Sequence, residues 1–415
     1  MTQSLELILL IALGLASAAL LGYWSAVTYH IGRTMVLIPT ARRGLSIEPS
    51  PDRALPTVCV IVPAHNEESC IQTIATTLVT QDYPPDLTRV VFVLDRCSDL
   101  TRERLDAVIA ASGGSIRTRI IELDECPPGW IGKSHALWSG TQLAPEAATS
   151  DLLLFIDADT KLDPRLIRAS ISLMLDRQVS FLSLLSTLRY DHWFERLVQP
   201  AAGMELMRQY PVVKANAVGP RRRPFANGQF ILVRRDDYLR IGGHKAVRDA
   251  VLEDVELARL ADRNNLLCGF YLDGGMLQCR MYDSFTALRR GWKRIYGESA
   301  NRKPARLRKI ARRVRLIGSI LPLLTIAAIV TGLLARTGSN ADAASIVLLT
   351  SIPALIIWLA VIAWMHILGR IPLAWVLAFP VGSWIVGGIM HEAASDLDRR
   401  KPTVWGGIEY TRDTR

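Results

Sequence analysis

The stretch Leu152-Leu-Leu-Phe-Ile-Asp-Ala-Asp159 is a short apolar run that ends in two carboxylates. An apolar run of this length is typical of a strand that is buried on both faces of a parallel sheet. Residues i and i+2 of an extended segment point to the same side, so Asp157 and Asp159 are expected to lie together. Two close carboxylates repel each other unless a cation intervenes, and Mg²⁺ or Mn²⁺ bound to phosphate oxygens suits that arrangement. We therefore predict a metal site at these two residues.

Two earlier apolar runs, 58–62 and 90–94, are also followed by residues that can bind a ligand. Helical patterns near 68–81 and 100–111 and a short strand near 118–121 accompany these runs. Strands that alternate with helices predict a parallel sheet covered on both faces, with ligands beyond the carboxyl ends of the strands. The residues that we assign to this edge, apart from the two aspartates, are Pro63, His65, Glu67 and Asp95.

Three polar side chains have candidate roles beside a nucleotide. Asp95 can accept the N–H of a base such as uracil. Glu67 can hydrogen-bond the nucleoside, or it is a first-turn helix acid favoured by the helix dipole. Lys133, in Gly129-Trp-Ile-Gly-Lys133, can reach a diphosphate because the glycines permit close approach; a solvated surface lysine is the alternative.

Glu253 and Asp254 lie at the start of a helical pattern over 254–261. Adjacent helical residues diverge by ~100°, so only one of the two carboxylates is expected to face the site. Whichever of the two carboxylates faces an acceptor hydroxyl can act as a general base. An acidic helix N-terminus without a catalytic role is the alternative.

Four uncharged runs, 7–31, 316–335, 344–369 and 371–390, each have about the length that a helix needs to cross a ~30 Å hydrocarbon core. The first run lacks a basic segment before it, so we interpret it as an uncleaved anchor. We divide the chain into an anchor, a polar domain, a basic amphipathic interfacial segment, C-terminal transmembrane helices and a polar tail, at 1–32, 33–285, 286–315, 316–391 and 392–415.

The net charge of +10 is concentrated in 287–315, directly before an apolar run. This pattern indicates a cytoplasmic membrane surface rather than nucleic acid, for which no binding module is visible. Both ends of the polar domain therefore point to the cytoplasm. The side of the C-terminus stays open, because four spans would place it outside, whereas Arg399, Arg400 and Lys401 favour the inside. The six cysteines form no C-x-x-C pair and suggest neither a disulfide framework nor a zinc site.

The segment 283–299 has apolar residues at helical spacing with cations between them. We expect an amphipathic helix in the membrane interface, with Trp292 as an anchor or as part of the donor site. Two of its cations, Arg290 and Arg294, are candidates for binding the leaving diphosphate.

The chain resembles the membrane-bound family 2 glycosyltransferases over about 58–296. It is similar in spacing to the hopanoid-associated and carotenoid-type enzymes, and more distantly to ceramide glucosyltransferases. The motifs that carry the resemblance, in order, are Val62-Pro-Ala-His-Asn-Glu-Glu68, Leu94-Asp95, Gly132-Lys133, Asp157-Ala-Asp159, Asn227-Gly-Gln229, Gly242-Gly-His244 and Glu253-Asp254.

This resemblance implies an α/β GT-A (Rossmann-like) fold with one N-terminal and two to three C-terminal transmembrane helices. It implies that Asp95 binds uracil, Asp157 contacts the ribose, Asp159 holds the metal against the diphosphate and Asp254 is the base. The segment Arg289-Arg-Gly-Trp-Lys-Arg294 is a degenerate form of the motif of processive enzymes.

The expected reaction is an inverting, Mg²⁺- or Mn²⁺-dependent transfer from a UDP-sugar to a membrane lipid or isoprenoid. The expected location is the bacterial inner membrane, as a multi-pass protein with its catalytic domain in the cytoplasm. A processive polysaccharide synthase and a non-catalytic membrane scaffold remain alternatives.

Overall fold

The computed structural model describes residues 3–48, 54–114, 116–405 and 408–410. The chain forms two compact units, which are described separately below. The polar unit comprises 37–189 and 210–281, and the helical unit comprises 1–36, 190–209 and 282–415. We expected one continuous polar domain over 33–285, but the segment 190–209, which contains helix α7 (Trp193–Gln209), clusters with the apolar helices instead.

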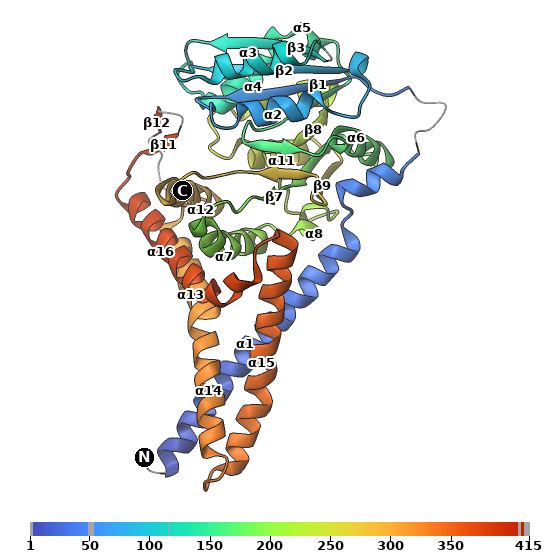
Figure 1. Ribbon diagram of the computed structural model, residues 1–415. Helices are drawn as coiled ribbons and strands as arrows, with labels where there is room; N and C mark the ends of the chain where they lie inside the picture. The colour runs from blue at the N-terminus through green and yellow to red at the C-terminus, as the bar shows by residue number, and fades with distance from the viewer. Residues whose placement is uncertain (1–2, 49–53, 115, 406–407, 411–415) are drawn as a thin grey trace. The chain divides into compact units, whose positions relative to one another are not determined.

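The polar unit is built on a seven-stranded sheet (Figure 1). In spatial order its strands are β3 (Arg117–Leu123), β2 (Thr88–Asp95), β1 (Val58–Ala64), β4 (Leu152–Phe155), β8 (Ile231–Arg234), β6 (Phe181–Leu185) and β9 (Cys268–Leu272). The strands predicted near 58–62, 90–94, 118–121 and 152–156 are thus confirmed, and they lie side by side in parallel.

The sheet also contains an antiparallel strand that was not predicted from the sequence. β8 runs antiparallel to both β4 and β6, so the sheet is mixed. A parallel pair needs a crossover that returns the chain to the starting edge. The chain instead enters β8 through the loop 216–230, after the excursion through α7, and this loop delivers it to the opposite end of β4.

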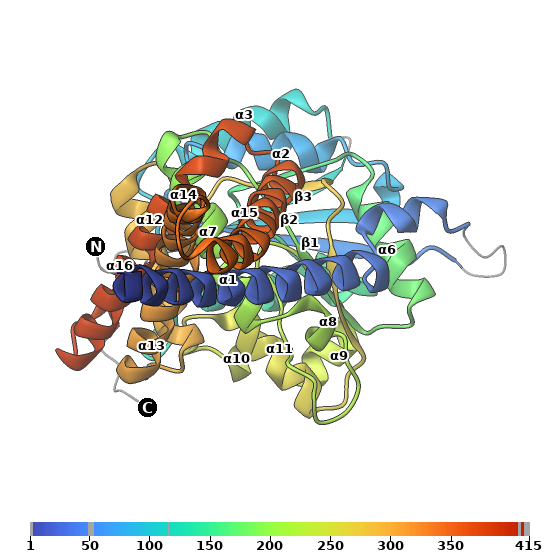
Figure 2. The same cartoon turned by 90° about the horizontal axis from the view of Figure 1, so that it is seen from below.

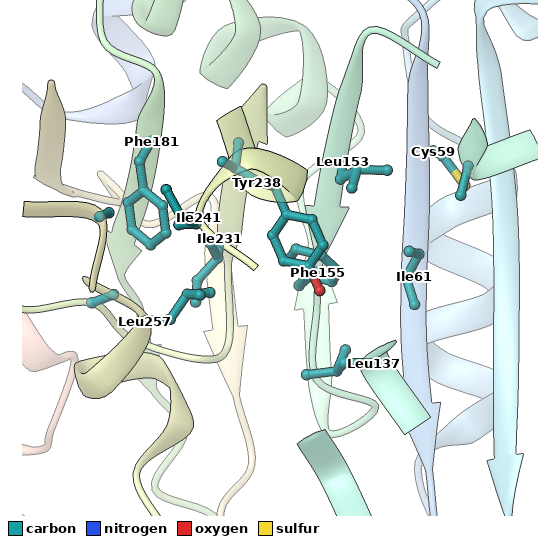
Figure 3. Close-up of a cluster of buried hydrophobic side chains, with 14 of the residues drawn as sticks. Cys59, Ile61, Leu137, Leu153, Phe155, Phe181, Ile231, Tyr238, Ile241 and Leu257 are labelled. Carbon is teal, nitrogen blue, oxygen red and sulfur yellow. The ribbon is translucent and has the colours of Figure 1, made fainter. Parts of the chain in front are cut away.

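The core of the polar unit explains why these apolar runs become strands. Cys59 and Ile61 of β1 lie in one cluster with Phe155 and Tyr238 (Figure 3). The alternate residues of β1 are also fully buried, so the strand is covered on both faces. Each fully buried aliphatic side chain contributes about 1.5–3 kcal/mol to folding.

Helices and short strands surround this sheet. A second sheet has the order β5 (Thr160–Leu162), β10 (Leu277–Cys279) and β7 (Thr187–Leu188). The helices of the polar unit are η1 (Ala41–Ser46), α2 (Ile71–Val79), η2 (Pro85–Leu87), α3 (Thr101–Ala111), α4 (Gly132–Leu143), α5 (Pro145–Ala148), α6 (Leu166–Asp176), α8 (Val212–Ala215), α9 (Arg235–Arg240), α10 (Gly243–Ala246) and α11 (Glu253–Arg263).

The helical unit contains the apolar runs. Besides α7 its elements are α1 (Gln3–Leu37), α12 (Phe285–Ser299), α13 (Pro304–Arg315), η3 (Leu316–Ile320), α14 (Leu321–Ala335), α15 (Ala341–Gly369), η4 (Leu373–Ala378), α16 (Phe379–Asp398), β11 (Thr403–Trp405) and β12 (Ile408–Tyr410). Among the residues that the structure describes, four helices are long and apolar enough to cross a membrane, at Gln3–Leu37, Pro304–Ala335, Ala341–Gly369 and Leu373–Asp398. This agrees with one N-terminal and up to three C-terminal spans.

Three of these helices form a bundle. Their labels are α1, α14 and α15 in Figure 1 and again in Figure 2. Leu10 and Leu13 of α1 pack with Ala328 of α14 and Val347 of α15. The fourth, α16, packs instead along α13, α7 and α12. Its N-terminal part is held to the π-helical turn η3, where the Ser319 hydroxyl donates to the Pro380 carbonyl at 2.6 Å.

The basic segment 286–315 contains two helices, and the first of them is the helix predicted over 283–299. Ser284 caps α12 by accepting the N–H of Ala287 at 3.1 Å. Asn301 and Arg302 have positive φ and separate α12 from α13. Several of the cations pair with acids of neighbouring helices and are therefore not all available to lipid; the pairs are Arg289–Glu392, Lys293–Asp396, Arg308–Asp398 and Arg313–Glu205.

Candidate active site

The carboxyl ends of β1, β2 and β4 meet at one edge of the large sheet. β1 pairs in parallel with β2 and with β4, so the residues that follow these strands are neighbours. The His65 ring Nδ1 lies 2.6 Å from the carbonyl oxygen of Asp95, which ties the first two strand ends together. Pro63 is itself a buried residue of β1.

Asp95 is held by its neighbour in sequence. Both oxygens of its carboxylate accept hydrogen bonds from the Arg96 guanidinium, at 2.9 and 2.7 Å. A Cβ added to Gly132, at the start of α4, would lie 2.8 Å from Asp95 Oδ2 and from Arg96 Nη2. We expected the glycines before Lys133 to permit close approach to a diphosphate. In the structure, Gly132 lets the start of α4 lie close to the Asp95–Arg96 pair.

Lys133 is the cation at the centre of the site. Its Nζ lies 2.7 Å from Asp157 Oδ1 and 2.8 Å from Glu253 Oε1, and its side chain is 18% exposed. Burial alone lowers the pKa of this ammonium, but the charges of Asp157, Glu253 and Asp254 raise it above the usual value. Lys133 therefore stays charged, and the alternative of a solvated surface lysine is wrong.

Glu253 and Asp254 both face this ammonium, contrary to the expectation that only one could. The Asp254 carboxylate accepts the N–H groups of Gly228 and Val255, each at 2.8 Å. A Cβ on Gly228 would lie 2.9 Å from Lys133 Nζ and 3.3 Å from an oxygen of each acid. The absent side chain at Gly228 and the longer side chain of Glu253 let both carboxylates gather there.

The two acids differ in their electrostatics. Burial, followed by the negative charge of Glu253, raises the pKa of Asp254 to about 7. Burial alone would raise the pKa of Glu253, but the positive charge of Lys133 lowers this pKa below its usual value. Glu253 is thus the ionised partner of the lysine, and Asp254 is the acid that can exchange a proton near neutral pH.

Asp157 and Asp159 supply the oxygen atoms that hard divalent ions prefer. Burial, then the charges of Asp157 and Glu67, raises the pKa of Asp159 to about 8. Its Oδ1 is buried without a hydrogen-bond partner in the part of the chain that the structure describes. This orphaned oxygen fits a divalent cation. Over the described ranges no three His, Cys, Asp or Glu side chains converge as ligands, so the phosphates of a donor would have to complete the coordination.

Glu67 lies within electrostatic range of this pair. Burial raises the pKa of its carboxyl group, and its Oε2 accepts a hydrogen bond from the Cys70 thiol at 3.0 Å. These three acids, which come from two separate motifs, therefore share one region of the polar unit with Lys133.

The remaining candidates, Arg290, Trp292 and Arg294, lie on α12 in the helical unit. Trp292 is only 2% exposed and stacks on Tyr296, with ring centroids 5.2 Å apart. Their contact with a diphosphate stays a prediction.

Several site residues were not predicted from the sequence. Nothing in the sequence singled out Arg96, and the motif Asn227-Gly-Gln229 indicated the family but no role for Gly228. Gly228 lies between Asn227 and Gln229, just before an apolar run, and this pattern was the one indication in the sequence of close packing there.

Known proteins with similar sequences show which family the chain belongs to. The model of "Glycosyltransferase like family 2" matches residues 56–273, more than half of the chain. The 4,4'-diaponeurosporenoate glycosyltransferase of Staphylococcus aureus strain MRSA252 is 27% identical over 274 residues, which cover 64% of this chain and 67% of that protein. The corresponding enzyme of strain USA300 is 26% identical over 272 residues, with the same coverage of both chains.

Solved structures with a similar arrangement are more distant. The mannosyltransferase PcManGT from Pyrobaculum calidifontis, in complex with GDP-Man and Mn²⁺, has a TM-score of 0.46 and 20% identity over 92% of this chain and 98% of that chain. The TarS fragment 1–349 of S. aureus, in complex with UDP, has a TM-score of 0.39 and 13% identity over 86% and 96%. The family match together with the observed α/β sheet confirms the fold class. The chain belongs to the glycosyltransferase-like family 2 and is a glycosyltransferase.

Proposed function

We propose that the protein transfers a sugar from a nucleotide-diphosphate donor, a UDP-sugar, to a hydroxyl group of an apolar membrane acceptor, with inversion at the anomeric carbon. The observation that carries this proposal is the position of Lys133 between Asp157 and Glu253, with Asp254 at the same point. One cation there links the strand edge expected to bind the donor with the helix expected to carry the base.

The donor is proposed to bind along the carboxyl edge of the sheet. Asp95, oriented by Arg96, would accept the N–H of the base, and Asp157 would contact the ribose. Asp159 would hold a divalent cation, which stabilises negative charge on the diphosphate when it is bound. Lys133 would add a fixed positive charge beside the same group.

Asp254 is proposed to act as the general base. It would take the proton of the acceptor oxygen as that oxygen bonds to the anomeric carbon and the bond to the diphosphate breaks. The N–H groups of Gly228 and Val255 hold both of its oxygens and so fix its direction. The leaving nucleoside diphosphate departs with the electron pair of the broken bond.

The acceptor is proposed to be a lipid or isoprenoid in the bacterial cytoplasmic membrane. The relatives from S. aureus are named for 4,4'-diaponeurosporenoate. Four long apolar helices accompany the catalytic unit of this chain, which supports an acceptor of similar polarity. The polar unit is proposed to face the cytoplasm, because basic residues next to a membrane span, such as those before α14, favour the cytoplasmic side.

Incubation of the purified full chain with radiolabelled nucleotide sugars and a bacterial lipid extract tests this proposal. The expected result is one label moving into an organic-soluble product that carries a single sugar. Label in long polymer would instead favour a processive synthase. Label in no product, with every donor and with Mg²⁺ or Mn²⁺ present, would contradict the proposal.

A further inference from the structure

The loop 227–229 before β8 connects the two halves of the proposed site. Asn227 anchors this loop to β6: its backbone N–H donates to Ser183 Oγ at 2.8 Å and its side-chain amide donates to the Leu184 carbonyl at 3.2 Å. The next residue, Gly228, donates its N–H to Asp254. The loop therefore holds the proposed base from one side.

Gln229 extends the loop in the other direction. Its Oε1 accepts hydrogen bonds from the Ser186 hydroxyl and from Asn227 Nδ2, the latter at 3.1 Å. Its amide orientation is thereby fixed, and its Nε2 donates to Cys279 Sγ at 2.7 Å. Gln229 is 8% exposed and Cys279 is fully buried.

Cys279 in turn reaches Asp159. Cys279 lies opposite Thr160 in the β5–β10 pair, next to Asp159 in the chain, and this register places its thiol beside the Asp159 carboxyl group. Because Cys279 Sγ accepts from Gln229, its S–H is left to donate to that carboxyl group. The following residue, Arg280, donates its backbone N–H to the Asp159 carbonyl at 3.0 Å. The end of β10 therefore holds Asp159 through both its side chain and its backbone.

We propose that Gln229 and Cys279 are positioning residues that orient the Asp159 carboxylate toward the cation on the donor diphosphate. Through the shared loop 227–229, the same hydrogen bonds keep that carboxylate in a fixed relation to Asp254. This inference rests on the proposed function in one respect, the role of Asp159 as a metal ligand. Hydrogen-bond partners of ligating carboxylates commonly matter nearly as much as the ligands themselves.

The test measures Mn²⁺ affinity of the full chain in the presence of UDP, by the loss of the free-ion EPR signal. Cys279→Ala removes the donor and is expected to weaken Mn²⁺ binding by about 10- to 100-fold. Cys279→Ser keeps a donor and is expected to stay within about threefold of the wild type. In sugar transfer, the apparent KM for Mn²⁺ should rise in Cys279→Ala while kcat at saturating Mn²⁺ changes little.

Two further variants separate positioning from simple core packing. Cys59→Ala removes an equally buried thiol from β1 and should lower the unfolding temperature without changing Mn²⁺ affinity. Gln229→Met keeps the side-chain size but loses the amide, and should weaken Mn²⁺ binding. Its effect should not add fully to that of Cys279→Ala, because both act through one chain of hydrogen bonds.

Equal Mn²⁺ affinities of Cys279→Ala, Cys59→Ala and the wild type would overturn the inference and leave the proposed function standing. A wild-type chain that transfers sugar but binds no Mn²⁺ with UDP would overturn the metal role of Asp159 and the inference together. A wild-type chain that binds Mn²⁺ and UDP but transfers no sugar would count against the proposed function alone.

Discussion

Lys133 decides the electrostatics of the site at the scale of single residues. Three carboxylates lie around its ammonium, so the cluster carries net negative charge before any ligand binds. Such a cluster favours the protonated form of one of its acids. Asp254 is that acid, because the nearby Glu253 keeps its own charge through the ion pair with Lys133.

Glu253→Gln should therefore move the pH dependence of transfer. Asp254 can accept a proton only when it is ionised, so wild-type kcat/KM should fall as the pH drops through about 7. Removal of the Glu253 charge lowers the pKa of Asp254, and the fall should occur at a lower pH. The pH profile of kcat/KM measures the shift, and Glu256→Gln, on the same helix but paired with Arg259, is the control. An unchanged profile in Glu253→Gln would refute the electrostatic link.

At the scale of elements, the start of α4 matters most. Gly132 has no room for a side chain, because its Cβ would meet the Asp95–Arg96 pair at 2.8 Å. Gly132→Ala should shift α4 away from β2 or push Asp95 out of place. We expect UDP affinity to fall at least tenfold, about 1.4 kcal/mol, as measured by calorimetry.

The control for this variant is Gly203→Ala. Gly203 lies within helix α7, and an added Cβ meets nothing within 4 Å. Alanine there should leave UDP affinity unchanged and raise helix stability slightly. If Gly132→Ala bound UDP as tightly as Gly203→Ala, the close approach of α4 would have no part in donor binding.

The strands and helices also show how much of the fold could be predicted from the sequence. β1, β2 and β4 were predictable because each is a continuous apolar run that ends in polar residues. The direction of β8 was not, since strand pairing depends on where the preceding loop delivers the chain. The ion pairs of α12 and α13 with α16 were equally hidden, because their partners are about a hundred residues apart in sequence, as for Arg289 and Glu392.

The residues of the candidate site also fall into two groups, those that could be predicted from the sequence and those that could not. Asp95, Asp157, Asp159 and Asp254 were proposed from local patterns at strand ends and at a helix start. The side chains that hold them, such as Arg96, Gly228 and Cys279, were missed because their roles arise only from contacts between distant segments. Local patterns indicate which atoms can do chemistry, whereas tertiary contacts determine which atoms orient them.

At the scale of the whole molecule, the packing of α16 bears on membrane topology. α16 packs along α13, outside the bundle of α1, α14 and α15, and its acids pair with cations of α12 and α13. The paired acids lie at the C-terminal end of α16, and charged side chains favour the interface over the hydrocarbon core for that end. We therefore expect three crossings, with the segment after α16 on the same side as the polar unit.

Reporter fusions after Arg400 test this topology. A cytoplasmic end predicts a fluorescent green fluorescent protein fusion and an inactive alkaline phosphatase fusion. Fusions after Arg336, at the end of α14, should give the opposite pair of results and serve as the control. An active phosphatase after Arg400 would indicate four crossings and contradict the interfacial placement of α16.

The most direct test of the whole account is Asp254→Asn, assayed in parallel for donor binding and for single-turnover sugar transfer. The side chain keeps its size, and the donor contacts proposed for Asp95, Asp157 and Asp159 are untouched. The account predicts UDP-sugar affinity within about threefold of the wild type and a transfer rate at least about a hundredfold lower, since general-base catalysis contributes 10²–10⁴-fold. An Asp254→Asn chain that transferred sugar at the wild-type rate would contradict it.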